Sequence, residues 1–244
     1  MSAIAASHIG EARVKELLRE ATAWRLLGLL FERPRDGWWR EVDMLSREVV
    51  DPEITAAAGA ARKEASEGLY LALLGPGGPV SLREVTYRGM EDPGRIIADI
   101  SAFYEAFAFQ PETEEAPDHL AVEAGFLGYL CLKEAYARAR GTEDEAEVAA
   151  QAAARFREEH LATLAWPVAD RLAEADACHL PLAAAALARR AGPRRDLTAT
   201  RTPRLPSCDE CLECGDELGP NHQRGETGVT TREWVQVGLL GAGP

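Results

Sequence analysis

The fold is decided near the middle of the chain by residues 115–127, which read Glu115-Ala116-Pro117-Asp118-His119-Leu120-Ala121-Val122-Glu123-Ala124-Gly125-Phe126-Leu127. Proline is tolerated in the first turn of a helix, because its missing N–H would be unpaired there anyway. The free N–H groups and the positive end of the helix dipole favour acidic residues at the same place. His119 and Glu123 are four residues apart and so share one helix face. The stretch predicts a helix start with Asp118 and His119 on its first turn, forming an acidic, titratable patch suited to a basic partner.

Amphipathic helical patterns lie on both sides of this stretch. Apolar residues recur every three to four positions, β-branched runs are sparse, and alanine and leucine dominate, all of which favour helices over sheets. Helices are predicted over about residues 11–31, 38–49, 52–73, 96–107, 118–140, 143–161, 167–175 and 181–191. We therefore predict an all-α fold, a single globular bundle of about eight helices over residues 1–192. Residues 193–244 are expected to form an irregular, flexible tail that contains cysteines.

Composition narrows the class of partner. The chain has 244 residues, 46% of them hydrophobic, which is enough for a substantial core. The formal net charge of −13 argues against nucleic-acid binding, which needs clustered lysine and arginine. A basic peptide is a more natural partner for an acidic surface, although acidity can equally serve solubility alone.

The sequence predicts a cytoplasmic protein without stable membrane insertion. No stretch approaches the roughly 20 apolar residues of a membrane helix. Residues 1–10 lack the basic and apolar segments of a secretory signal. Five cysteines without a disulfide-type spacing indicate a reducing compartment.

A glycine- and proline-rich loop, Gly75-Pro76-Gly77-Gly78-Pro79, interrupts the helices and continues irregularly to Pro93. Long ordered loops of this kind are often functional. No lysine follows as a Walker phosphate loop would require. The loop is expected to be either a rigid connector or the wall of a peptide groove, with Tyr70 and Tyr87 as amphipathic contacts.

Enzyme signatures are missing from the chain. There is no nucleophile elbow, no Gly-x-Gly-x-x-Gly and no His-Glu-x-x-His. His119 and Glu123 make at most half of a metal site, and His160 lacks a Glu-x-x-His partner. We predict a non-enzyme that requires no cofactor. A structural role for Asp118 and His119, through helix capping and hydrogen bonds to the preceding loop, stays open beside the binding role.

The tail carries one possible metal site. Cys208, Cys211 and Cys214 form a C-x₂-C-x₂-C run, and His222 follows eight residues later. Such a Cys₃His set can hold zinc, and clustered thiolates can hold an iron–sulfur cluster. The alternative is a reduced tail without metal. A metal-binding adaptor that acts through these residues is the second candidate function.

Taken together, these motifs resemble the TorD/DmsD/NarJ-type, or nitrate reductase delta-like, redox-enzyme maturation chaperones. The resemblance rests on the Glu115–Glu123 stretch, the Gly75–Gly77 loop with Ser81 and Tyr87, the Phe103-Tyr104-x-x-Phe107 pattern, and the His160-Leu161 pair before Trp166. It covers roughly residues 11–190. The cysteine tail does not belong to the pattern.

The resemblance implies a chaperone that binds the N-terminal leader, such as a twin-arginine signal, of a molybdopterin oxidoreductase catalytic subunit and assists cofactor insertion and assembly before export. It places peptide binding at Ser81, Leu82, Tyr87, Pro117, Asp118 and His119. Carboxylates pair with arginine through two parallel hydrogen bonds, so Asp118, aided by Glu114, Glu115 and Glu123, is expected to hold the leader's arginines. The apolar segment would lie against Leu82 and Tyr87, and His119 would tune affinity near neutral pH. Whether the chaperone is a monomer or a homodimer stays open.

Overall fold

The protein is described by a computed structural model over residues 3–194, with side chains from residue 10 onward. These residues belong to a compact unit, Met1–Thr200. The elements in chain order are α1 (Ala3–Leu30), α2 (Trp38–Ser46), α3 (Pro52–Glu64), α4 (Glu67–Leu74), the 3₁₀ turn η1 (Glu84–Tyr87), α5 (Pro93–Ala106), α6 (Leu120–Arg140), α7 (Glu143–Phe156), the π turn η2 (Arg157–Leu161), α8 (Ala162–Leu172) and α9 (His179–Ala191). Since η2 joins α7 to α8 without a break, these segments make eight separate α-helical rods over residues 3–194, and the predicted all-α fold is confirmed. The predicted domain boundary after residue 192 stays a prediction.

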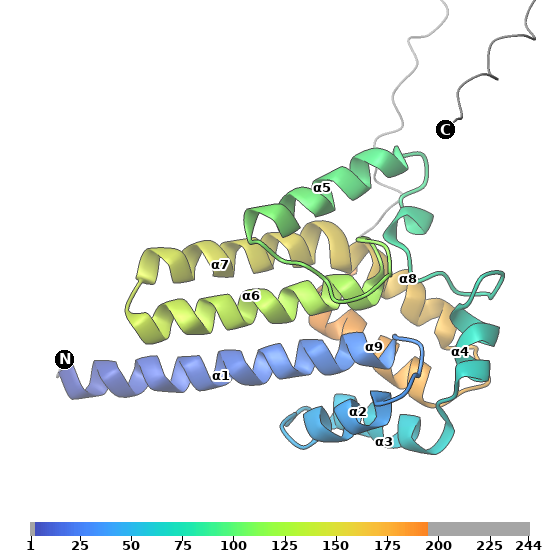
Figure 1. Cartoon of the computed structure of the whole chain (residues 1–244), viewed down its shortest axis with the longest axis horizontal. Coiled ribbons are helices and arrows are strands. Elements are labelled where there is room, and N and C mark those ends of the chain that lie inside the picture. The colour runs from blue at the N-terminus through green and yellow to red at the C-terminus, as the bar shows by residue number, and fades with distance from the viewer. Residues whose placement is uncertain (1–2, 195–244) are drawn as a thin grey trace, which may run out of the picture. The chain divides into compact units, whose positions relative to one another are not determined.

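Helices α1, α6 and α7 lie side by side along most of their lengths (Figure 1). Two glycines allow α1 and α6 to approach closely in antiparallel orientation. A Cβ atom on Gly28 would lie 3.0 Å from the Ala121 carbonyl oxygen, and one on Gly128 would lie 3.1 Å from the Ala21 carbonyl oxygen. Because glycine has no Cβ, the two backbones can meet at both points without a clash.

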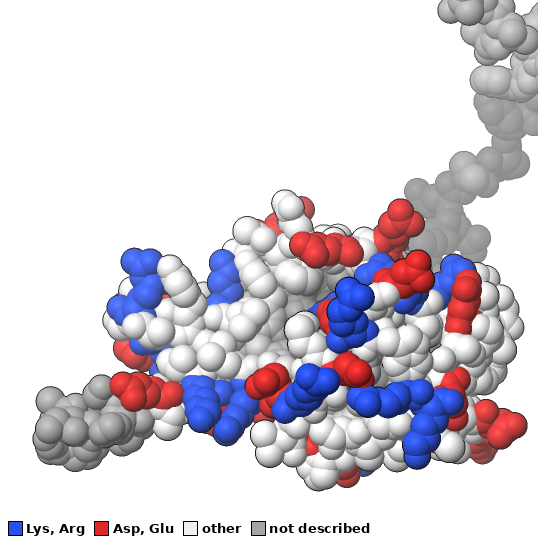
Figure 2. Space-filling model, turned by 60° about the horizontal axis from the view of Figure 1, so that its bottom comes forward, with Lys and Arg blue, Asp and Glu red and all other residues white. Residues whose placement is uncertain are grey.

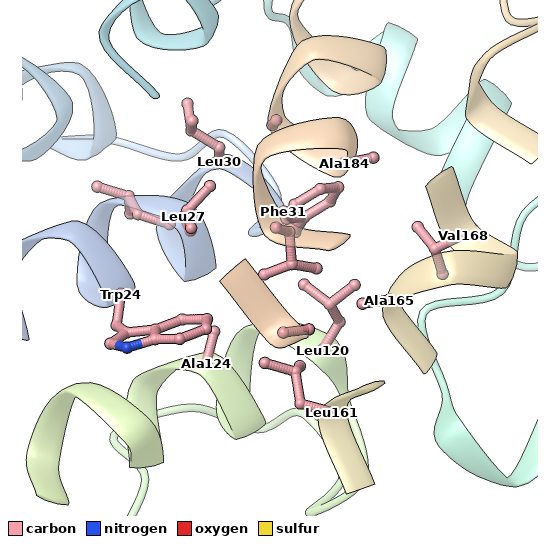
Figure 3. Close-up of a cluster of buried hydrophobic side chains, with 14 of the residues drawn as sticks. Trp24, Leu27, Leu30, Phe31, Leu120, Ala124, Leu161, Ala165, Val168 and Ala184 are labelled. Carbon is pink, nitrogen blue, oxygen red and sulfur yellow. The ribbon is translucent and has the colours of Figure 1, made fainter. Parts of the chain in front are cut away.

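The core lies where α1, α6, α8 and α9 meet (Figure 3). Its labelled members are Trp24, Leu27, Leu30, Phe31, Leu120, Ala124, Leu161, Ala165, Val168 and Ala184, all buried. Each fully buried leucine or phenylalanine side chain contributes about 1.5–3 kcal/mol. The start of α6 is therefore anchored by its apolar face, as the 115–127 stretch predicts.

An aromatic cluster attaches α5 to this core. The Phe156 ring on α7 lies 4.8 Å from Phe126 of α6 and 5.3 Å from Phe103 of α5, measured between ring centroids. Tyr104 of α5 packs on Phe126 at 4.8 Å and donates its hydroxyl to the Pro117 carbonyl at 2.8 Å. These contacts fix the chain entering α6 relative to α5.

The single helix predicted over residues 52–73 is wrong, because the chain breaks between α3 and α4. Ala65 is extended, and Ser66 caps α4 by accepting the Leu69 N–H at 3.2 Å. A serine before an apolar run is a helix-start signal that the periodicity concealed. At the other end of α3, Asp51 accepts the Glu53 N–H at 3.0 Å, as expected for a residue before proline at a helix start.

The helix boundaries around Pro167 also differ from the prediction. Pro167 lies inside α8 and not in its first turn, because η2 continues α7 into α8. Leu164, Val168 and Leu172 are buried on one face. The free energy gained by burying these three side chains exceeds the cost of the backbone hydrogen bond that Pro167 cannot donate.

The surface carries mixed charge. Figure 2 shows lysine and arginine side chains interspersed with aspartate and glutamate on the face that it draws. Within residues 3–194, no helix combines the length and the apolar character that crossing a membrane requires.

Candidate functional site: two connecting segments and the groove between α5 and α7

Two segments far apart in sequence pair beside the start of α6. The Glu84 N–H donates to the Asp118 carbonyl, and the Leu120 N–H donates to the Leu82 carbonyl, both at 2.9 Å. This isolated antiparallel bridge places Ser81–Tyr87 against Pro117–Leu120. The residues predicted from the family resemblance are therefore brought together, although most of them are not free to contact a peptide.

Asp118 precedes α6, so its predicted place on the first turn is wrong, and its side chain is fully buried. Its Oδ1 accepts the Arg83 Nε–H at 2.5 Å, and its Oδ2 accepts the Val85 N–H at 3.2 Å. The guanidinium is partly exposed, with 38% of its side-chain surface accessible. The carboxylate already has an arginine from this chain, a partner that the sequence analysis missed because Arg83 is 35 residues away.

His119 is the N-cap of α6, which confirms the structural alternative for this residue. Its Nδ1 accepts the Ala121 N–H at 3.2 Å, so the ring proton lies on Nε2, which is 3.8 Å from the Glu115 carboxylate. Burial lowers the pKa of His119 and Arg83 acts in the same direction, against Glu115 and Asp118. The neutral ring that capping requires is thereby favoured near neutral pH.

Internal hydrogen bonds fix the conformation of the 81–87 segment. The Tyr87 hydroxyl donates to the Ser81 carbonyl at 2.8 Å, and the Ser81 and Thr86 hydroxyls lie 2.9 Å apart. The Arg171 guanidinium covers the Tyr87 ring at 5.1 Å. Leu82 is only 3% exposed and belongs to the core, so the expectation that it lines a peptide surface is wrong for this conformation.

Glu115 is the most exposed of the predicted peptide-binding residues, with 43% of its side chain accessible, whereas Ser81, Tyr87 and Pro117 are half-buried. Its carboxylate lies near Tyr70 of α4. Burial, and then the charge of Glu115, raises the pKa of Tyr70 to about 12. Glu112 and Glu114 on the same segment are exposed as well. The acidic patch predicted around Asp118 is therefore displaced to residues 112–115.

Glu123 does not belong to that patch, because it is fully buried on α6. Burial, followed by the neighbouring Glu84 and Asp118 carboxylates, raises the pKa of Glu123 well above its usual range. The predicted pairing of Glu123 with leader arginines is incompatible with this position. Glu123 does share a helix face with His119, but this face of α6 points into the protein and not toward solvent.

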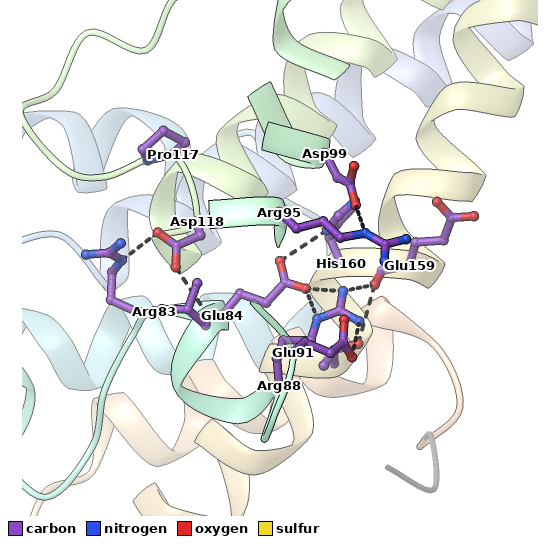
Figure 4. Close-up of polar contacts among 12 residues, drawn as sticks. Arg83, Glu84, Arg88, Glu91, Arg95, Asp99, Pro117, Asp118, Glu159 and His160 are labelled. Carbon is purple, nitrogen blue, oxygen red and sulfur yellow. Dashed lines mark hydrogen bonds and ion pairs between the residues drawn. The ribbon is translucent and has the colours of Figure 1, made fainter. Parts of the chain in front are cut away.

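A second polar cluster, not foreseen from the sequence, surrounds buried Glu84 (Figure 4). The carboxylate accepts the Arg88 Nε–H at 2.6 Å and lies 3.2 Å from His160 Nδ1 on the π turn. Arg88 also donates to the Glu159 carbonyl. A buried carboxylate needs such partners, because an uncompensated charge would cost several kcal/mol. The four-residue spacing of Glu84 and Arg88 was the available sequence signal.

An open groove of about 840 Å³ runs between α5 and α7 and ends at this cluster. Its apolar lining includes Ile96, Phe103, Phe107, Val148 and Ala152, and its charged lining is Arg88, Glu91, Arg95, Asp99, Arg155 and Glu159. The rim charges pair with each other. Arg155 lies 3.0 Å from Glu159, Arg95 lies 4.0 Å from Asp99, and Arg88 reaches Glu91 at 3.9 Å. The groove thus combines an apolar floor with a nearly neutral rim.

The part of the chain that the structure describes holds no cluster of three or more His, Cys, Asp or Glu side chains suited to a metal. The predicted ligands Cys208, Cys211, Cys214 and His222 lie outside the described residues. Metal binding by the tail stays a prediction.

Comparison with known proteins identifies the class. The chain is 37% identical over 153 residues to the selenate reductase assembly chaperone protein of Thauera selenatis, covering 60% of this chain and 72% of the relative. It is 33% identical over 152 residues to the chlorate reductase assembly chaperone protein of Ideonella dechloratans, with coverage of 60% and 72%. No solved structure matches.

These relatives, both named as assembly chaperones, define the class as a chaperone of enzyme assembly and not a catalyst. The sequence pattern of the nitrate reductase delta subunit family matches residues 43–166, more than half of the chain. The chain belongs to this family of redox-enzyme maturation chaperones. The resemblance inferred from the motifs is confirmed, and the metal-binding adaptor is not favoured.

Proposed function

We propose that the protein is a cytoplasmic, system-specific chaperone for the catalytic subunit of a molybdopterin reductase. It binds the subunit's N-terminal leader and holds the subunit while its cofactor is inserted, before export. Family membership and two relatives named as assembly chaperones of selenate and chlorate reductases support this function.

The observation that carries the leader-binding part is the groove between α5 and α7. A peptide helix binds such a groove through its apolar face. Helices α5 and α7 each have 14 residues. At 1.5 Å per residue, they offer about 21 Å of wall, enough for about four turns of a bound helix. Because the charged residues of the rim pair with each other, the groove suits a peptide segment with few charges, such as the apolar part of a leader.

The arginines of a leader need a separate acidic surface. Asp118 is already paired with Arg83, so Glu115, with its neighbours Glu112 and Glu114, is the better candidate. These side chains are accessible to solvent, and an arginine can pair with a carboxylate there through two parallel bonds. Exposed ion pairs contribute only about 0–1 kcal/mol each, so the apolar contacts must supply most of the affinity.

Titration calorimetry of the full chain with a synthetic leader peptide tests this proposal. Val148 lines the groove and is 57% exposed, so Val148→Asp introduces a charge into the floor without disturbing the core. Leu132 on α6 is 48% exposed and lies outside the lining, which makes Leu132→Asp the matched control. We expect Val148→Asp to weaken binding about tenfold or more, because an ionised group would be desolvated by the peptide.

Equal affinity of the two variants would refute the groove as the binding site. Failure of the wild-type chain to bind any leader, together with normal maturation of the client reductase in a deletion strain, would refute the function itself.

A further inference from the structure

Glu123 stands apart from the other buried polar groups. Among the described residues, its two carboxyl oxygens are the buried side-chain polar atoms without a hydrogen-bond donor. The side chain is completely buried on α6. An ionised carboxylate in such a place would cost far more than an unmade hydrogen bond between neutral groups. A carboxyl group with no donor can remove both penalties by binding a proton and becoming a donor itself.

The charged groups that shift the pKa of Glu123 are Glu84, Asp118 and Arg88, and each of them already has another partner. Arg88, the neighbouring cation, is bonded to Glu84 and the Glu159 carbonyl. The Tyr104 hydroxyl on α5 donates to the Pro117 carbonyl, and His160 on the π turn faces Glu84. Asp118 in the preceding loop is an acceptor that Arg83 occupies.

The Glu84 carboxylate is the acceptor that a protonated Glu123 can use. One Glu84 oxygen binds Arg88 and the other binds His160, and a carboxylate has about four acceptor sites. After burial, Glu84 is the largest cause of the raised pKa of Glu123, and the Glu84 carboxylate is itself fully buried. Since neither ionised carboxylate can donate, a proton between them converts a repulsive pair into a bonded one.

We propose that Glu123 is a neutral carboxylic acid that donates its O–H to Glu84, and that this bond positions Arg88 and His160 at the end of the α5–α7 groove. Glu123 is thus a positioning residue, connected to the groove through Glu84. The bond ties α6 to the 3₁₀ turn that carries Glu84, and Glu84 in turn holds the π turn. Only the effect on leader binding rests on the proposed function.

The experiment compares Glu123→Gln, Glu123→Leu and Glu134→Gln. Glutamine keeps a neutral donor, whereas leucine removes it at similar volume. Glu134 is the matched control, a buried glutamate on the same helix that is paired with Arg138 at 2.9 Å and with Arg13 at 3.3 Å. The first readout is the carbonyl band of a protonated carboxyl group in infrared difference spectra at neutral pH. We expect Glu123→Gln to remove this band and Glu134→Gln to leave it.

The second readout is the pH dependence of unfolding. The folded chain holds a proton on Glu123 that the unfolded chain releases above a pKa of about 4.3. Wild-type stability should therefore fall as pH rises from that value toward the raised pKa of folded Glu123. The fall should disappear in Glu123→Gln, whereas Glu134→Gln should lose stability at neutral pH.

The third readout is affinity for a leader peptide. We expect Glu123→Gln to bind within about twofold of wild type, and Glu123→Leu to bind about tenfold more weakly, as for the loss of one hydrogen bond. Absence of the infrared band from the wild-type chain, or a loss of stability in Glu123→Gln equal to that in Glu134→Gln, would overturn the neutral state. Wild-type affinity in Glu123→Leu would overturn the positioning role. If no leader binds the wild type, the proposed function fails, but the first two readouts still decide the protonation state.

Discussion

Replacing Asp118 by asparagine tests whether this residue holds the chain together before α6 or is free to receive a guest arginine. Its two oxygens accept from Arg83 Nε at 2.5 Å and from the Val85 N–H at 3.2 Å. Asparagine offers one acceptor and one NH₂ group. In either orientation, the NH₂ group faces a donor, so one of the two bonds is lost.

The expected cost follows from these contacts. A hydrogen bond to a charged group contributes about 1.5–3 kcal/mol, and a buried donor left without an acceptor costs about 1–3 kcal/mol. The partial exposure of Arg83 reduces the first contribution, because solvent screens the pair. We therefore expect Asp118→Asn to lower the free energy of unfolding by about 2–4 kcal/mol. For a domain of this size, the melting temperature should fall by about 4–16 °C.

Urea unfolding at neutral pH, followed by circular dichroism, measures this change. Asp92→Asn is the control, since Asp92 is an exposed N-cap that accepts the Gly94 N–H at 2.8 Å. Asparagine caps helices about as well as aspartate, so the control should change stability by less than about 0.5 kcal/mol. If both variants unfolded at the same urea concentration, the internal role of Asp118 would be refuted.

Three further substitutions test the packing and capping contacts. Phe156→Ala should lower the free energy of unfolding by about 3–5 kcal/mol, because the ring is fully buried, and a smaller loss in urea titration would contradict its central place. Gly128→Val should cost at least about 1–3 kcal/mol in the same assay, since its Cβ would lie 3.1 Å from the Ala21 carbonyl oxygen. Burial alone would raise the pKa of Glu64, but bonds from His179 and Cys178 at the start of α9 outweigh it and lower that pKa. The stabilisation by these bonds is present above the unfolded pKa of Glu64 and is lost as pH falls through the folded pKa. Glu64→Gln should therefore lower the free energy of unfolding by about 1–2 kcal/mol at pH 7 and leave it unchanged at low pH. A difference that does not depend on pH would contradict this role of Glu64.

The helices could be predicted because their signals are local. Apolar spacing, Pro52 after Asp51, and Gly141 after α6 are readable within one or two turns of chain. The break at Ser66 was missed because the apolar pattern continues through it. The family resemblance could be found for a similar reason, since its motifs are short and occur in a fixed order.

The state of the site residues could not be predicted, because it depends on contacts across the fold. An acidic residue near a helix start is usually exposed, and nothing local distinguishes buried Asp118 from exposed Glu115. The difference arises when the 81–87 segment pairs with residues 117–120, which brings Arg83 to Asp118 and Glu84 toward Glu123. Similarly, the α5–α7 groove depends on how far α5 stands from α7, and the apolar pattern of either helix does not contain that distance.

The π turn between α7 and α8 allows one continuous rod to serve two different neighbours. A π turn amounts to a single residue inserted into an α-helix, and each residue advances the helix by about 100°. The buried stripe is thereby redirected, so that α7 packs on α6 while α8 packs on α9. Shortening Arg157–Leu161 by one residue would rotate every side chain of α8 by about 100° relative to α9, although the rod itself would remain helical.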